Sequence, residues 1–153
     1  MLAAGEKAPQ FTLNDLEGNA HSLDGILARG PVLLTLFKVN CPTCQLTLPF
    51  LERISQGTLP VVTISQDDAA ATRRFQQSFG LTMPALIDPA SQGYKVSNAV
   101  GISTVPSLFV VEPDGEISSA GAGFNKAEIE QIGKRGGVEV FRQDDNVPAW
   151  KAG

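Results

Sequence analysis

The sequence predicts one α/β domain built on a mixed β-sheet with helices on its faces. Along the first hundred of its 153 residues, short apolar runs alternate with amphipathic segments, which is typical of a sheet covered by helices. Further along, two apolar runs are joined by Pro113-Asp-Gly115, a turn sequence that favours an antiparallel pair. The length suits a single domain, expected to span residues 1–153.

The N-terminal part is expected to extend the sheet and then to form its central strand. Residues 10–13 and 20–23 flank a turn-rich stretch, which indicates a hairpin or two short edge strands. Residues 32–37 form a nearly continuous apolar run, as a strand buried on both faces requires. Residues 42–56 place Leu46, Phe50 and Ile54 on one face of a helix.

The remaining segments continue the alternation. The sequence predicts strands at residues 61–64, 85–87, 107–111 and 116–120, and helices at 69–79, 91–100 and 126–134. Asp67 or Asp68 suits the cap of the 69–79 helix, and Gly80 its end. Residues 142–153 show no regular period, so we expect a loose tail after about residue 141.

Composition excludes several classes of function. Apolar residues make up 42% and charged residues 18%, which is too apolar for a disordered chain. The net charge of −4 and the lack of a Lys/Arg run disfavour nucleic acid and anionic membranes as partners. The longest apolar run is far too short to span a bilayer. Two cysteines and one histidine leave no complete four-ligand metal site, so we expect none.

Two further expectations concern the cellular compartment and the oligomeric state. The first residues lack the apolar core of a secretory signal, which favours the cytoplasm, with export as the alternative if a leader has been removed. No feature of the sequence indicates an obligate assembly, and we expect a monomer.

The segment with chemical meaning is Cys41-Pro-Thr-Cys44, between the central strand and the following helix. Pro42 suits the first helical position, which places Cys41 at the N-cap and Cys44 one turn along. Residues three apart on a helix are about 5–6 Å apart, within the reach of a disulfide. The free N–H groups at the helix start favour a thiolate at Cys41. We therefore predict that Cys41 is a nucleophile and Cys44 the resolving thiol.

Other interpretations of the two cysteines stay open. They could be inert packing residues, as free cysteines often are, or half of a metal site shared between chains. The position between a strand and a helix, in a chain with no other cysteine, favours redox chemistry over both.

The chain resembles thioredoxin-fold proteins, and more closely the redoxin (AhpC/TSA and TlpA-like) branch. The resemblance rests on the start Gly5-Glu-Lys-Ala-Pro9-Gln-Phe11-Thr-Leu13, on residues 37–44, on Pro49 within the helix, and on Thr104-Val105-Pro106. It covers residues 5 to about 135. The implied fold is thioredoxin-like, with an N-terminal strand extension and an insert of helix and strand at residues 68–100.

The resemblance also implies roles for single residues. Pro106 would be a cis proline beside the cysteines, and the backbone of Val105 would pair with an incoming chain. Pro42 and Thr43 form the spacer that separates the cysteines, where thioredoxins have Gly-Pro. The buried aspartate of thioredoxins is replaced by Thr35, so the usual proton acceptor is missing. Lys38 is a candidate cation that would favour the thiolate.

The expected activity is exchange or reduction of protein disulfides, with another thiol as electron donor and no cofactor. The first alternative is a peroxiredoxin-type hydroperoxide reductase with Cys44 as the peroxidatic residue. Aligned on Cys44, this chain has Cys41 and Phe37 where the peroxiredoxin motif has threonine and proline, which weakens that alternative. The second alternative is an interaction module that keeps the fold without catalysis.

Overall fold

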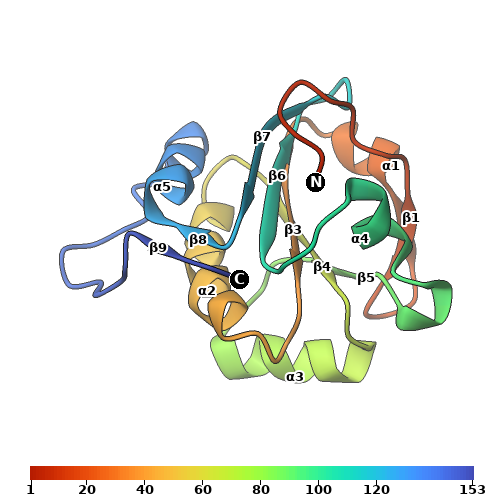
Figure 1. Cartoon of the computed structure of the whole chain (residues 1–153), viewed down its shortest axis with the longest axis horizontal. Helices are drawn as coiled ribbons and strands as arrows, with labels where there is room; N and C mark the ends of the chain where they lie inside the picture. Colours follow the sequence, from red (N-terminus) through yellow and green to blue (C-terminus); the bar gives the residue numbers. More distant parts are fainter.

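A computed structural model describes residues 1–153, and its centre is a seven-stranded mixed sheet (Figure 1). The strands are β1 (Thr12–Asp15), β2 (Ala20–Ser22), β3 (Val32–Phe37), β4 (Val61–Ser65), β5 (Ala85–Ile87), β6 (Ser107–Val111) and β7 (Ile117–Ala122). Their order is β2-β1-β5-β4-β3-β6-β7, in which β3, β4 and β5 run parallel and the others add antiparallel edges. The sheet is therefore mixed, as predicted.

Helices cover both faces of this sheet. They are α1 (Leu23–Leu27), α2 (Pro42–Ser55), α3 (Ala69–Phe79), α4 (Lys95–Val100) and α5 (Lys126–Arg135), with a 3₁₀ turn, η1, at Ala90–Gln92. In Figure 1, α2 and α5 lie to the left of the sheet, α1 and α4 to its right, and α3 below. A second, two-stranded sheet pairs β8 (Phe124–Asn125) with β9 (Trp150–Lys151). None of the helices is both long enough and apolar enough to cross a membrane.

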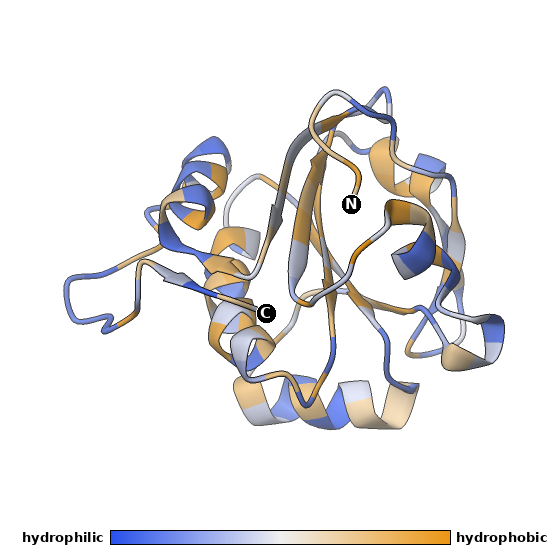
Figure 2. Cartoon of the chain, viewed as in Figure 1, coloured by the Kyte–Doolittle hydropathy of each residue, from blue (hydrophilic) through white to orange (hydrophobic).

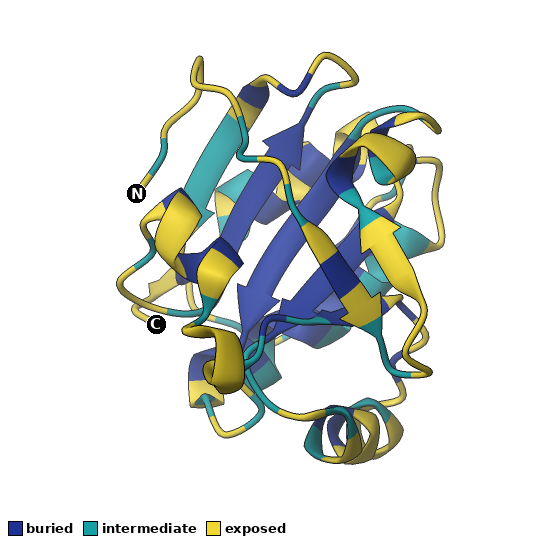
Figure 3. Cartoon of the chain, turned by 90° about the vertical axis from the view of Figure 1, so that its right-hand side faces the viewer, coloured by how far each residue is buried: buried dark blue, intermediate teal, exposed yellow.

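Strand β3 divides the core into two clusters. Leu33 and Phe37 face the larger cluster, formed with α2 and α5. Leu34 and Leu36 face the other cluster, formed with α1 and α4. This follows from the period of two along a strand, which sends successive side chains to opposite faces. Figures 2 and 3 show the result: the central strands are apolar and buried, and the polar, exposed residues lie on the helices and loops around them.

The structure differs from the sequence-based expectations in three places. Helix α1, capped by the Ser22 hydroxyl, was not predicted, because five residues are too few to show a helical period. The helix expected at residues 91–100 is divided into η1 and α4, since Gly93 and Tyr94 both adopt positive φ angles. Residues 142–153, expected to form a loose tail, contact the domain: Val147 packs against the core cluster of α2 and α5, and β9 pairs with β8.

Candidate active site

Cys41 occupies the N-cap of α2, where the chain leaves β3. Its backbone is extended (φ −90°, ψ 115°), and its Sγ accepts a hydrogen bond from the Cys44 N–H at 3.1 Å. Pro42 follows at the first helical position, where a missing N–H costs nothing. A thiol at an N-cap lies against the free N–H groups and positive end of the helix, which stabilise a negative sulfur. The local geometry is that of an activated nucleophile.

Cys44, one turn along α2, has a different environment. Its side chain is completely buried, whereas Cys41 is only half-buried. Burial raises the pKa of the Cys44 thiol above its usual range, and the hydrogen bond with Cys41 acts in the same direction. The two free thiols are therefore unequal: Cys41 is accessible at the helix N-cap, and Cys44 is enclosed and held neutral.

A third element reaches the site from β6. The Val105–Pro106 peptide bond is cis, as the resemblance implied, and the Val105 carbonyl oxygen accepts from Cys41 Sγ at 3.4 Å. The two residues lie 64 positions apart in the sequence. The fold thus places one backbone edge, just before β6, directly beside the accessible sulfur.

Thr43, between the two cysteines, contacts the tail. Its side chain is almost fully buried, and its hydroxyl donates to the Ala152 carbonyl oxygen at 2.6 Å. Nothing in the sequence indicated this contact, because residues 142–153 carry no period or motif. The tail therefore belongs to the surroundings of the dithiol.

The side chain of Lys38, the candidate cation, is exposed to solvent. What reaches Cys44 is the backbone of Lys38, which partly offsets the rise in the pKa of that thiol. Asp67, not recognised as a site residue from the sequence, accepts from the Val39 N–H at 2.8 Å and fixes the loop before Cys41. Its position just beyond β4 was the available signal, since parallel strands end at one edge of a sheet.

Thr35 lies on the face of β3 that packs against α2. Its hydroxyl is buried and has no hydrogen-bond partner. Nowhere in the structure do three or more His, Cys, Asp or Glu side chains come together as metal ligands would.

Comparison with known proteins agrees with this geometry. The model of the AhpC/TSA family matches residues 4–120, which include every strand from β1 to β6 and both cysteines. The chain belongs to the AhpC/TSA family. Within it, the chain is 29% identical over 136 residues to the thiol-disulfide oxidoreductase ResA of Geobacillus thermodenitrificans, covering 85% of this chain and 76% of that protein. ResA of Halalkalibacterium halodurans is 30% identical over 122 residues, covering 76% and 67%.

Solved structures share the fold at lower identity. The thioredoxin domain of a thiol-disulfide oxidoreductase from Bacteroides vulgatus superposes with a TM-score of 0.77 at 20% identity, covering 89% of this chain and 99% of that one. The peroxidoxin BcpB of Mycobacterium tuberculosis gives 0.74 at 19% identity, covering 88% and 98%. This AhpC/TSA chain therefore has the thioredoxin-like fold that the sequence predicted. Proteins named as a thiol-disulfide oxidoreductase and as a peroxidoxin share that fold.

Proposed function

We propose that this protein is a thiol–disulfide oxidoreductase whose active dithiol is Cys41 and Cys44. The observation that carries the proposal is the unequal pair at the start of α2, with Cys41 accessible at the N-cap and Cys44 buried one turn along. The relatives named as thiol-disulfide oxidoreductases support the same activity. Disulfide exchange needs an exposed thiolate to attack and a protected thiol to complete the reaction.

The reaction follows from this geometry in two steps. The Cys41 thiolate attacks one sulfur of a substrate disulfide, forms a mixed disulfide and releases the first substrate thiolate. Cys44 loses its proton and attacks Cys41 Sγ, which forms the Cys41–Cys44 disulfide and releases the second thiolate. Two electrons pass from the dithiol to the substrate, and the protons of the two cysteines end on the substrate thiols. A second thiol compound must then reduce the protein.

The expected substrates are protein disulfides. The Val105 backbone lies beside Cys41 Sγ and offers an extended chain an edge with which to pair. Pro106 directly follows Val105 at this edge, and Pro42 and Thr43 form the spacer between the two cysteines.

A hydroperoxide reductase is the less favoured alternative. A peroxidatic Cys44 would have to be ionised and reached by peroxide, whereas it is fully buried and burial raises its pKa. A non-catalytic interaction module would have no reason to keep one thiol accessible at a helix N-cap.

The test uses the two serine variants. With a disulfide substrate, Cys44→Ser should accumulate a mixed disulfide on Cys41, visible as a mass increase, because the resolving thiol is absent. Cys41→Ser should react no faster than a free thiol in solution. Far-ultraviolet circular dichroism of both variants checks that they fold.

Two results would overturn the proposal. One is alkylation of Cys41 by iodoacetamide at pH 6 no faster than that of a free thiol. The other concerns hydroperoxide. If the Cys41→Ser protein consumed hydroperoxide rapidly and the Cys44→Ser protein did not, the peroxidase alternative would be established.

A further inference from the structure

The last residues of the described chain lie across the edge of the dithiol site. Strand β9 pairs antiparallel with β8, with Trp150 opposite Asn125 and Lys151 opposite Phe124. The Lys126 N–H, at the start of α5, donates to the Ala149 carbonyl oxygen at 3.0 Å. Figure 1 shows the end of this segment between the start of α2 and β6. The segment is thus an extended chain laid beside Cys41.

Its final two residues contact one side-chain group and one backbone group next to the cysteines. The Ala152 carbonyl oxygen accepts from the Thr43 hydroxyl, in the spacer itself. Gly153 approaches Val105 so closely that a Cβ on it would lie 2.2 Å from the Val105 carbonyl oxygen. That oxygen is also the acceptor for Cys41 Sγ. The tail therefore occupies the backbone edge that an incoming substrate chain would use.

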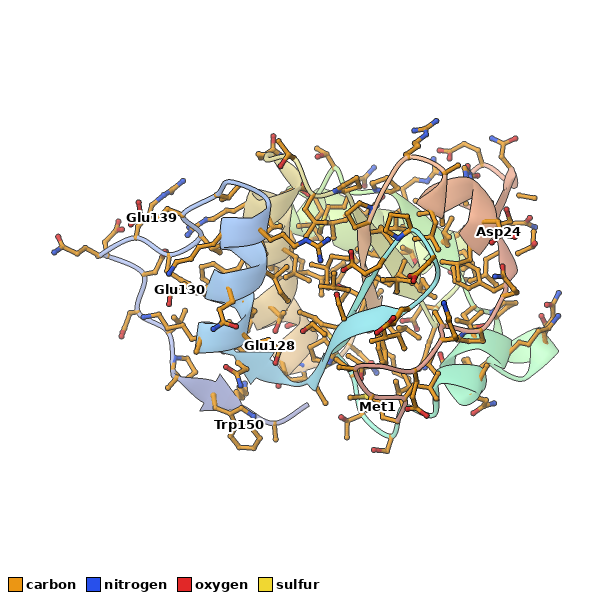
Figure 4. The ribbon with its side chains drawn as sticks, turned by 90° about the horizontal axis from the view of Figure 1, so that it is seen from above. Met1, Asp24, Glu128, Glu130, Glu139 and Trp150 are labelled. Atoms are coloured by element: carbon orange, nitrogen blue, oxygen red, sulfur yellow. The ribbon has the colours of Figure 1, made fainter.

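The contacts that hold this segment are mainly backbone contacts. Residues 149–153 are all exposed, and the Trp150 side chain is 60% exposed. In Figure 4 the Trp150 ring points outward from the domain rather than into it. A chain held by main-chain hydrogen bonds, with little apolar burial, is replaceable by another extended chain that offers the same groups.

The base of the tail is fixed much more firmly. Phe141 is buried, with its ring 4.8 Å from that of Phe50. Asp145 forms a two-pronged ion pair with Arg53 of α2, at 2.6 and 3.1 Å. Segment 149–153 can therefore leave the site without leaving its neighbourhood, which keeps its effective concentration at the site high.

We propose that residues 149–153 are a built-in competitor for extended peptide substrates, bound at the Thr43–Val105 edge and displaced when a substrate chain pairs there. The proposal rests on the function proposed above and adds the substrate class and a control on its access. A bound tail raises the apparent half-saturation concentration for a peptide, because only the open fraction of the protein binds it. A small disulfide that needs only Cys41 Sγ is affected less.

Gly153→Val in the full chain tests the proposal, because its side chain has no room against Val105. The matched control is Gln143→Val, which adds the same side chain at an exposed tail position before the ion pair. Release of the tail is followed by the fluorescence anisotropy of Trp150, the only tryptophan, and by hydrogen exchange at the Lys126 N–H. Pre-reduced protein is mixed with an unstructured peptide carrying one glutathionylated cysteine, or with hydroxyethyl disulfide.

We expect Gly153→Val to lower the Trp150 anisotropy and to lower the half-saturation concentration for the peptide about tenfold. The rate with hydroxyethyl disulfide should change much less, and Gln143→Val should match the unmodified protein in both assays. Either of two results overturns the proposal that the tail is a competitor. The tail of Gly153→Val stays bound, or it is released and the half-saturation concentration for the peptide does not fall. If the unmodified protein and both variants reduce neither disulfide, the proposed function itself fails.

Discussion

Two cysteines three residues apart have opposite roles because one helix turn separates two environments. Cys41, at the N-cap, receives an N–H and the positive end of α2, while Cys44 faces the core among apolar side chains. Burial raises the pKa of Cys44, so this thiol stays protonated until the mixed disulfide has formed. Residue type and spacing predict this asymmetry well, since both follow from where the helix begins.

The proton acceptor for Cys44 is harder to predict, and Thr35 gives a direct test. Its hydroxyl is buried without a partner, which costs free energy that a methyl group of the same shape would not. We expect Thr35→Val to raise the free energy of unfolding by about 1 kcal/mol and to leave the rate of disulfide reduction unchanged. Chemical denaturation and single-turnover kinetics measure the two effects.

The matched control is Thr63→Val, on the neighbouring strand β4. Thr63 lies opposite Thr35 in the register, is also buried, and donates its hydroxyl to the Pro84 carbonyl oxygen at 3.0 Å. Thr63→Val should therefore destabilise the protein by about 1 kcal/mol. A fall in the rate with Thr35→Val would instead show that its hydroxyl takes part in moving the Cys44 proton.

At the scale of elements, helix α5 shows packing prevailing over helix propensity. Gly133 lies inside this helix, where alanine is normally better by about 1 kcal/mol. A Cβ at Gly133 would, however, lie 2.1 Å from a methyl group of Val140, which is fully buried. The glycine allows the chain after α5 to fold back closely against the helix.

We therefore expect Gly133→Ala to destabilise the protein by about 1–3 kcal/mol, the usual cost of overpacking a core. Denaturant unfolding measures the change, with Lys134→Ala, an exposed neighbour in the same helix, as the control. Adding Val140→Ala to Gly133→Ala should cost less than the sum of the single changes, since the small side chain removes the clash. A stabilising Gly133→Ala would contradict this account.

Elements with a strong local signal were predicted closely, and elements fixed by distant contacts were not. Strand β3 and helix α3 have the predicted bounds, because an apolar run and a capped, glycine-terminated helix are local patterns. Strand β9 is two exposed residues whose only order comes from pairing with β8, far back in the chain. No window of sequence around Trp150 contains that information.

The same limit applies to the site as a whole. Cys41, Cys44 and Pro106 were predicted from a motif and a resemblance, and the structure brings Cys41 and the Val105–Pro106 bond together. Asp67 and the tail were missed as parts of the site. Asp67 accepts a hydrogen bond from the Val39 N–H, and the Ala152 carbonyl oxygen of the tail accepts one from the Thr43 hydroxyl. Because each bond uses a backbone atom as one partner, it leaves no pattern of side chains in the sequence.

At the scale of the whole molecule, two carboxylates join parts of the chain that are distant in sequence. Asp145 pairs with Arg53 and ties the tail to α2, and Glu112, just after β6, pairs with Arg135 at the end of α5. The hydrogen bond from Arg53 lowers the pKa of Asp145 to about 2. The hydrogen bond from Arg135 lowers the pKa of Glu112 to about 2 as well.

These shifts predict a loss of stability in acid. A carboxylate whose pKa is lower in the folded state stabilises that state above its unfolded pKa, here about 4, and loses this contribution as the pH falls toward 2. We expect the melting temperature to fall over this range. Asp145→Asn and Glu112→Gln should each reduce that fall by about 2–4 °C, a modest effect because both ion pairs are partly exposed.

Glu128 supplies the control with the opposite sign. Its carboxyl lies in the first turn of α5, labelled in Figure 4, and has one buried oxygen without a partner. Burial raises its pKa, so Glu128 destabilises the folded state once the pH exceeds its unfolded value of about 4.5. Glu128→Gln should therefore raise the melting temperature at pH 7 and lose that advantage near pH 4. If Glu128→Gln changed the melting temperature by the same amount at pH 7 and at pH 4, the carboxyl would be solvated rather than buried.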